Sequence, residues 1–96
     1  MQFKSNINMK DISRMIEIAE IYSITNQKGK YEECLKNIIK LCDESPKNED
    51  TLQIKMHSLT LLNKPYKSLE TTNELLNLNP YNIHALLNIA AYLRSD

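Results

Sequence analysis

The spacing between two prolines is the feature that most constrains the fold of this chain. Pro46 and Pro80 are each followed by a polar segment and then by a helical pattern of apolar residues. Their spacing, which we call the repeat step, equals the period of 34 that is typical of helix-turn-helix repeats. Units of this kind bury their apolar faces only by stacking on neighbours. The sequence therefore predicts a helical repeat protein in which the last copy stops halfway.

The composition favours helices and argues against several classes of function. Three prolines and one glycine in 96 residues leave few turns, and strands are not expected. Twelve basic and twelve acidic side chains give a net charge of zero, so nothing indicates a nucleic acid or an anionic membrane as partner. Neither a membrane span nor a secretory signal is predicted, so a cytosolic protein is expected.

The two cysteines are expected to be free thiols that pack in the core. Cys34 and Cys42 are eight residues apart on one predicted helix, a rise of about 12 Å that is too long for a disulfide. Free cysteines behave as small hydrophobic residues and indicate a reducing compartment. No further ligand stands at a suitable spacing, so neither a metal nor another cofactor is predicted.

Apolar periodicity predicts an N-terminal arm at residues 1–8 and a single helical domain at residues 9–96. Gly29 is predicted to end the first helix in a left-handed conformation, with Asn63 in the same role one repeat step later. Asn82 is predicted to cap the last helix. The expected helices run from about Asn8 to Asn26, Lys30 to Glu44, Glu49 to Leu62, Pro65 to Leu78 and Ile83 to Arg94.

The segment NPYNIHALLNIAAYL, residues 79–93, resembles the junction between tetratricopeptide repeats. Thr72 and Asn73 depart from the preceding repeat, where the apolar pair Ile38 and Ile39 stands. The resemblance implies an all-α fold of five antiparallel helices, about two and a half repeats in a short right-handed solenoid. Residues that correspond one repeat step apart are Gly29 and Asn63, Tyr31 and Pro65, Cys34 and Ser68, and Pro46 and Pro80.

The resemblance also implies a concave groove that holds a peptide or helix of a partner and is lined by the first helix of each repeat. The groove positions include no Lys or Arg, so a clamp for an acidic C-terminus is not expected. Their mixed but apolar character suits an amphipathic helix. The groove positions are Ile16, Ala19, Ser23, Gln53, Ile54, His57, Thr60, Leu61, His84, Leu87, Asn88 and Ala91.

The last predicted helix is expected to show apolar surface, because a second helix would normally cover part of it in a complete repeat. Leu87, Ala91 and Tyr92 are predicted to spread apolar surface over its exposed side. The residues predicted to pack back onto the preceding helices are Ile83, Leu86, Ile89, Ala90 and Leu93.

No motif in the sequence indicates an enzyme. A glycine-rich phosphate loop, a nucleophile motif and a spaced set of histidines and carboxylates are all missing. His57 and His84 leave open a metal site or a pH-sensitive site, although a third ligand is lacking. Lining of the groove is the alternative role for these two histidines.

These features predict a small chaperone or adaptor that holds an amphipathic helix of a partner and keeps it soluble. In size, degenerate repeats and apolar groove, the chain resembles the co-chaperones of bacterial type III secretion, a virulence system. Such proteins keep the needle subunit monomeric in the cytoplasm, in a heterocomplex with a second small helical chaperone. The alternative is a self-associating scaffold or a regulatory adaptor without a chaperone role, and a homodimer stays open where the partner is absent.

Overall fold

The computed structural model describes residues 9–94, and all regular structure in this range is helical. The prediction of an all-helical chain with five helices is confirmed for these residues, which include no strand. The predicted arm at residues 1–8 lies outside the described range, as do residues 95–96. The helices are α1 (Met9–Ile24), α2 (Lys28–Glu44), α3 (Glu49–Leu61), α4 (Pro65–Leu78) and α5 (Ile83–Arg94).

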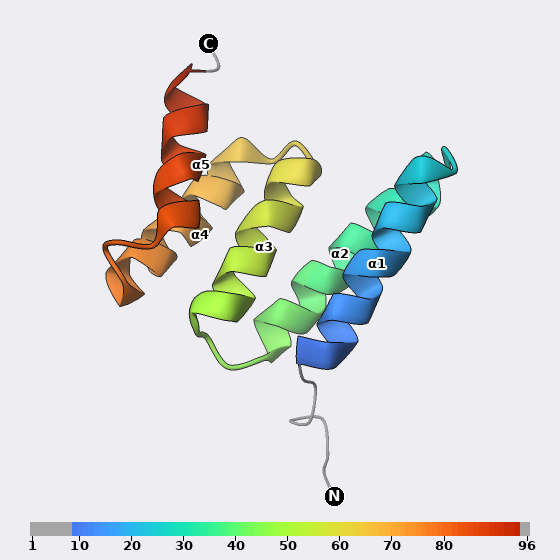
Figure 1. Cartoon of the computed structure of the whole chain (residues 1–96), viewed down its shortest axis with the longest axis horizontal. Coiled ribbons are helices and arrows are strands. Elements are labelled where there is room, and N and C mark those ends of the chain that lie inside the picture. The colour runs from blue at the N-terminus through green and yellow to red at the C-terminus, as the bar shows by residue number, and fades with distance from the viewer. Residues whose placement is uncertain (1–8, 95–96) are drawn as a thin grey trace, which may run out of the picture.

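The helices pack in chain order into a flat molecule. Each helix contacts the next one along the chain, and α1 and α5 lie at opposite edges with α3 between them (Figure 1). The principal extents are 39 × 36 × 17 Å, and the shortest of them is less than two helix diameters of about 10–12 Å. This arrangement is compatible with helical repeats, in which each unit contacts only its neighbours.

The core is divided into two clusters. The second cluster joins α3, α4 and α5 through Leu52, Met56, Leu75 and Ala85. The first lies mainly between α1 and α2, and both cysteines in it are buried and free, as the sequence predicts. The buried members of the first cluster are Ile12, Ala19, Cys34, Leu35, Ile38 and Cys42.

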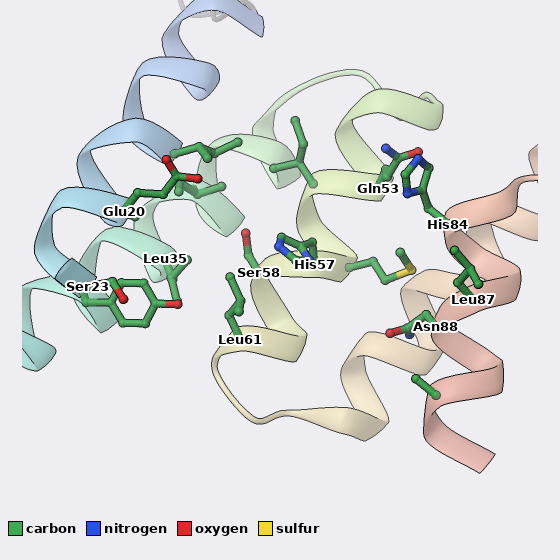
Figure 2. A pocket seen from close by; sticks show the side chains of 17 residues that line it. Glu20, Ser23, Leu35, Gln53, His57, Ser58, Leu61, His84, Leu87 and Asn88 are labelled. Atoms are coloured by element: carbon green, nitrogen blue, oxygen red, sulfur yellow. The ribbon is translucent and has the colours of Figure 1, made fainter. Parts of the chain in front are cut away.

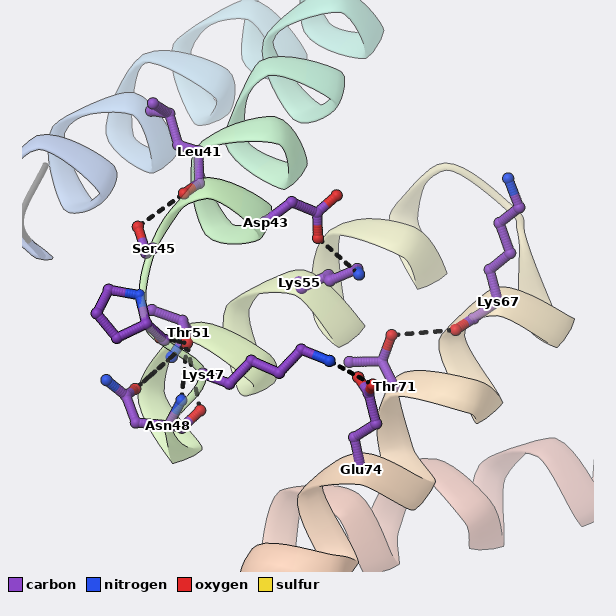
Figure 3. Close-up of polar contacts among 11 residues, drawn as sticks. Leu41, Asp43, Ser45, Lys47, Asn48, Thr51, Lys55, Lys67, Thr71 and Glu74 are labelled. Carbon is purple, nitrogen blue, oxygen red and sulfur yellow. Dashed lines mark hydrogen bonds and ion pairs between the residues drawn. The ribbon is translucent and has the colours of Figure 1, made fainter. Parts of the chain in front are cut away.

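Two asparagines, one repeat step apart, cap α3 and α5. Asn48 Oδ1 accepts a hydrogen bond from the Thr51 amide at 2.9 Å, and Thr51 Oγ1 accepts one from the Asn48 amide at 3.2 Å (Figure 3). Asn82 Oδ1 accepts from the Ala85 amide at 2.9 Å, so the predicted cap at Asn82 is confirmed. Each asparagine satisfies an amide of the first helical turn, so the repeat step marks equivalent helix starts.

The turns from α1 to α2 and from α3 to α4 share one geometry. Asn26 and Asn63 adopt left-handed backbone, with φ of 58° and 61°. The Gln27 amide donates to the Tyr22 carbonyl at 2.9 Å, and the corresponding bond after Asn63 is also 2.9 Å. These are the hydrogen bonds of a Schellman turn, which closes the end of a helix.

The prediction that Gly29 forms the first of these turns is wrong. Gly29 is the second residue of α2 and does not have a positive φ. Asn26 takes the left-handed position because its short polar side chain tolerates that conformation better than most residues do. The interval from Asn26 to Asn63 is longer than the repeat step. The second helix of the first repeat, α2, has 17 residues, whereas the second helix of the next repeat, α4, has 14. The repeat step therefore holds at the starts of α3 and α5 but not at these turns.

Small residues stand where the paired helices approach closely. Cys34 Sγ lies 3.3 Å from the Met15 carbonyl oxygen, across the contact between α1 and α2. Ser68 Oγ donates to the Met56 carbonyl at 3.1 Å, across the contact between α3 and α4. Both contacts reach the main chain of the neighbouring helix, which a larger side chain would hold at a greater distance.

The loop between α2 and α3 is held by polar contacts on both sides (Figure 3). Ser45 Oγ donates to the Leu41 carbonyl at 2.7 Å at the end of α2. Lys47 pairs with Glu74 of α4 at 2.8 Å, although both side chains are largely exposed. Exposed ion pairs add little stability, about 0–1 kcal/mol, so the apolar clusters rather than this pair set the helix positions.

The side of α5 that packs inward differs from the predicted one. Ala85 is fully buried, whereas three residues predicted to pack inward, Ile83, Leu86 and Leu93, are exposed. The small side chain of Ala85 allows close approach to the second cluster, and Asn88 on the same side bonds to hydroxyl groups of α4. The prediction is wrong for these three residues, whereas the other two, Ile89 and Ala90, are half-buried. It followed the larger apolar residues and did not include Ala85.

Candidate protein-binding pocket

A pocket of about 710 Å³ lies between α1, α3 and α5, with residues of α2 in its wall. Figure 2 shows His57, Ser58 and Leu61 of α3 between the labelled residues of α1 and those of α5. The pocket thus brings together side chains from helices at opposite edges of the molecule. We refer to it as the large pocket.

Eleven of the twelve groove positions inferred from the sequence line the large pocket. On each of the three helices these positions are spaced mostly three or four residues apart, which places them on one side of the helix. Their role in binding a partner stays a prediction. They are Ile16, Ala19, Ser23, Gln53, Ile54, His57, Leu61, His84, Leu87, Asn88 and Ala91.

Thr60 is the one groove position outside the large pocket. Its Oγ1 donates to the Met56 carbonyl at 3.0 Å and lies 2.8 Å from Ser68 Oγ of α4. It lines a smaller pocket of about 220 Å³, together with Tyr92 of α5. Thr60 therefore belongs to the contact between α3, α4 and α5.

Asn88 lines the large pocket, and its side-chain amide is hydrogen-bonded to two hydroxyl groups of α4. Its Nδ2 donates to Ser68 Oγ at 3.1 Å and to Thr72 Oγ1 at 2.9 Å. Thr72 is fully buried, and its hydroxyl donates to the Ser68 carbonyl at 2.9 Å. One repeat step earlier this position is Ile38. The buried Thr72 hydroxyl is therefore both a donor and an acceptor of hydrogen bonds, and it links α5 to α4.

Six further residues, which are not among the groove positions, also line the large pocket. Leu35, Ile38 and Met56 are buried, so they form its floor. Glu20 is the only Asp, Glu, Lys or Arg in the lining, and it follows Ile16 by one helical turn of α1. The helical phase of α1 could have indicated Glu20 from the sequence. The residues of α2 were missed because the groove positions were taken only from the first helix of each repeat. The six are Glu20, Tyr31, Leu35, Ile38, Met56 and Ser58.

The lining surface is chiefly apolar, although eight of its seventeen residues have polar side chains. Leu61 of α3 and Leu87 of α5 keep 46% and 60% of their surfaces exposed. His57 and His84 also line the pocket, and neither forms a side-chain hydrogen bond within residues 9–94. In the same range, no three His, Cys, Asp or Glu side chains gather where they could hold a metal ion. Such a lining favours contact with an apolar surface over directional recognition of a small polar ligand.

Burial raises the pKa of both cysteine thiols. For Cys42 the pKa rises to about 11, because burial and the neighbouring carboxylate of Asp43 disfavour the thiolate. Burial also raises the pKa of Cys34. Because the thiolate is the reactive form, both residues act as packing groups at neutral pH.

Comparison of the chain with family models, with curated proteins and with solved structures gives no match in any of the three. In the described part of the chain, no helix is both long enough and apolar enough to cross a membrane. The resemblance to tetratricopeptide repeats accordingly rests on the sequence pattern alone.

Proposed function

We propose that this chain is a protein-binding chaperone or adaptor whose large pocket holds an amphipathic helix of a partner protein. The observation that carries the proposal is the chiefly apolar lining, in which Leu61 and Leu87 remain about half exposed. Covering such surface stabilises a complex by roughly 25 cal/mol per Å² of apolar area. A helix suits the pocket because its apolar stripe can cross α1, α3 and α5 while its polar side stays in water.

The charge in the pocket indicates the charge of the partner helix. Glu20 on α1 is the only fully charged side chain in the lining. A Lys or Arg beside the apolar stripe of the bound helix would pair with Glu20, whereas an acidic residue there would be repelled. The proposed helix therefore has a basic residue at the end that contacts α1.

For the cellular role, we propose the needle subunit of a bacterial type III secretion system as the partner. The complex would keep the subunit monomeric in the cytoplasm, together with a second small helical chaperone. Covering an amphipathic helix of the subunit would remove the apolar surface that drives its polymerisation. Degenerate repeats and the apolar pocket support this role. The alternative is a self-associating scaffold or a regulatory adaptor, which the exposed apolar side of α5 favours.

Leu61→Asp and Leu87→Asp test the proposal with a synthetic peptide of the needle subunit's amphipathic helix. Each substitution should weaken binding at least about tenfold, or about 1.4 kcal/mol, because it places a carboxylate against the apolar stripe of the peptide. Fluorescence anisotropy of the labelled peptide measures the affinity. Ile24→Asp is the matched control, since Ile24 is exposed on α1 and does not line the pocket.

The proposal fails if Ile24→Asp weakens binding as much as the two pocket substitutions do. It also fails if the loss of affinity simply follows a loss of thermal stability, because the leucines would then act in folding. A scaffold without a chaperone role predicts that the wild-type chain leaves the peptide unbound.

A further inference from the structure

An outward-facing apolar stripe on α5 is distinct from the large pocket. Ile83, Leu86, Ala90 and Leu93 follow one another at spacings of three, four and three residues, and we call them the outer face of α5. Ile83 and Leu93 are 64% and 71% exposed, and Leu86 is 46% exposed. None of the four lines either described pocket. The spacing is that of a helix seam that packs against another helix.

The equivalent side of α3 shows how such a stripe is covered. One repeat step before Leu86, Ala90 and Leu93 stand Leu52, Met56 and Leu59, all three at most 4% exposed. Helix α4 packs on this side of α3. Leu75 joins Leu52 and Met56 in one cluster, and Ser68 Oγ bonds to the Met56 carbonyl. The contact sets a bulky residue of one helix against a small residue of the other.

From the exposed, uncharged and symmetrically spaced residues of the outer face of α5 we infer that it binds the same face of a second copy of this chain, with the two helices antiparallel. In the register centred between positions 86 and 90, Leu86 of one copy meets Ala90 of the other, and Ile83 meets Leu93. The two central pairs then set a bulky residue against a small one, as Met56 stands against Ser68, and the two outer pairs set Ile83 against Leu93. The face is therefore complementary to itself, which a two-fold dimer requires.

The charge distribution agrees with a second copy as the occupant. The outer face has no charged side chain, so two copies do not repel each other across it. Arg94 is the only Asp, Glu, Lys or Arg of α5, and an antiparallel pair keeps the two Arg94 side chains at opposite ends. Four residues per copy bury less than the roughly 1,200 Å² of a stable interface. The dimer is accordingly weak, with a dissociation constant in the micromolar range or above.

A dimer formed in this way leaves both large pockets free. His84, Leu87, Asn88 and Ala91 line the pocket from other positions around α5. Each dimer would then offer two binding sites, whatever occupies them. The inferred dimer does not rest on the proposed function. Substitutions on the outer face of α5 test the dimer, and substitutions on its pocket side test the proposed function.

Sedimentation velocity over roughly 1 μM to 1 mM, the range of weak association, tests the inference on the full chain. The wild-type mass should rise from 11.2 kDa toward twice that value. Leu86→Glu and Ala90→Lys should each weaken dimerisation at least tenfold. An equimolar mixture of the two variants should dimerise again, because the antiparallel register sets the introduced carboxylate against the introduced ammonium group.

Leu87→Glu is the matched control, since it changes the pocket side of the same helix and should leave dimerisation unchanged. Circular dichroism should show that all variants remain folded, because the three positions are at least partly exposed. A mass of 11.2 kDa at every concentration would overturn the inference and leave the outer face to a helix of another protein. A dimer that survives Leu86→Glu, is abolished by Leu87→Glu, or is not restored in the mixture would equally overturn it.

Discussion

At the scale of single residues, the helix-to-helix turns depend on asparagine rather than glycine. Asn26 and Asn63 have φ of 58° and 61°, whereas Gly29 lies inside the first turn of α2. Apart from its chain neighbours and the backbone of its own helix, a Cβ atom added at Gly29 would meet no atom within 4 Å. Glycine is therefore not required at position 29, and its conformational freedom in the unfolded chain only opposes folding there.

Gly29→Ala should stabilise the protein by roughly 0.5–1 kcal/mol, because alanine loses less conformational entropy in a helix than glycine does. Asn26→Ala should destabilise it by about 1 kcal/mol, because alanine is strained at a positive φ. Urea denaturation followed by circular dichroism measures both free energies. Asn26→Gly is the control and should be close to neutral. The opposite order of the two alanine variants would mean that Gly29 forms the turn in solution.

At the scale of helices, the starts of α3 and α5 are joined through one carboxylate. Glu49 Oε1, in the first turn of α3, accepts hydrogen bonds from Asn79 Nδ2 at 3.1 Å and from Asn82 Nδ2 at 2.8 Å. Asn82 also caps α5, so Glu49 links the first turn of one helix to the cap of the other. Helix polarity alone explains an acidic residue at Glu49, but only the packed helices bring Asn79 and Asn82 to it.

The hydrogen bonds from Asn82 and Asn79 hold the pKa of Glu49 below its ordinary value. A lowered pKa in the folded state gives stability that is present above the ordinary pKa of about 4.3 and is lost as pH falls through the folded value. Melting temperatures measured between about pH 3 and pH 7 should therefore fall more steeply with acid for the wild type than for Glu49→Gln. NMR titration of the Glu49 carboxylate gives its pKa directly. Identical pH profiles for the two proteins would contradict the link.

At the scale of the whole molecule, the flat shape and the divided core limit cooperativity. The radius of gyration is 13.8 Å, larger than the value of about 12.5 Å expected for a compact domain of this size. Ile38 is fully buried in the cluster between α1 and α2, and Leu75 is fully buried in the cluster of α3, α4 and α5. Each cluster draws on few large side chains, so each half of the molecule can open separately.

Ile38→Ala and Leu75→Ala should each cost about 2–5 kcal/mol, because both remove buried methyl groups and leave a cavity. Amide hydrogen exchange should rise mainly in α1 and α2 for the first variant, and mainly in α3 to α5 for the second. Ile24→Ala is the control, since Ile24 is 79% exposed and should change the stability by less than about 0.5 kcal/mol. An equal rise in exchange over all five helices for both variants would show a single cooperative core instead.

Local sequence patterns were enough to predict which segments are helical and where α3 and α5 begin. Apolar periodicity, Pro46 and Pro80, and the cap at Asn82 act through residues close in the chain, so local chemistry is enough to predict them. Eleven of the twelve groove positions that the resemblance implied also line the large pocket, and those on each helix share one side because they are mostly three or four residues apart.

Which side of α5 turns inward, and which residues of α2 complete the large pocket, depend on packing between helices. The buried side of α5 is chosen by contacts that link distant residues, in which Ala85 fits against the second cluster and Asn88 bonds to Ser68 and Thr72. Apolar periodicity cannot show this choice, because α5 is apolar around most of its circumference. The same packing leaves Ile83, Leu86 and Leu93 in contact with water.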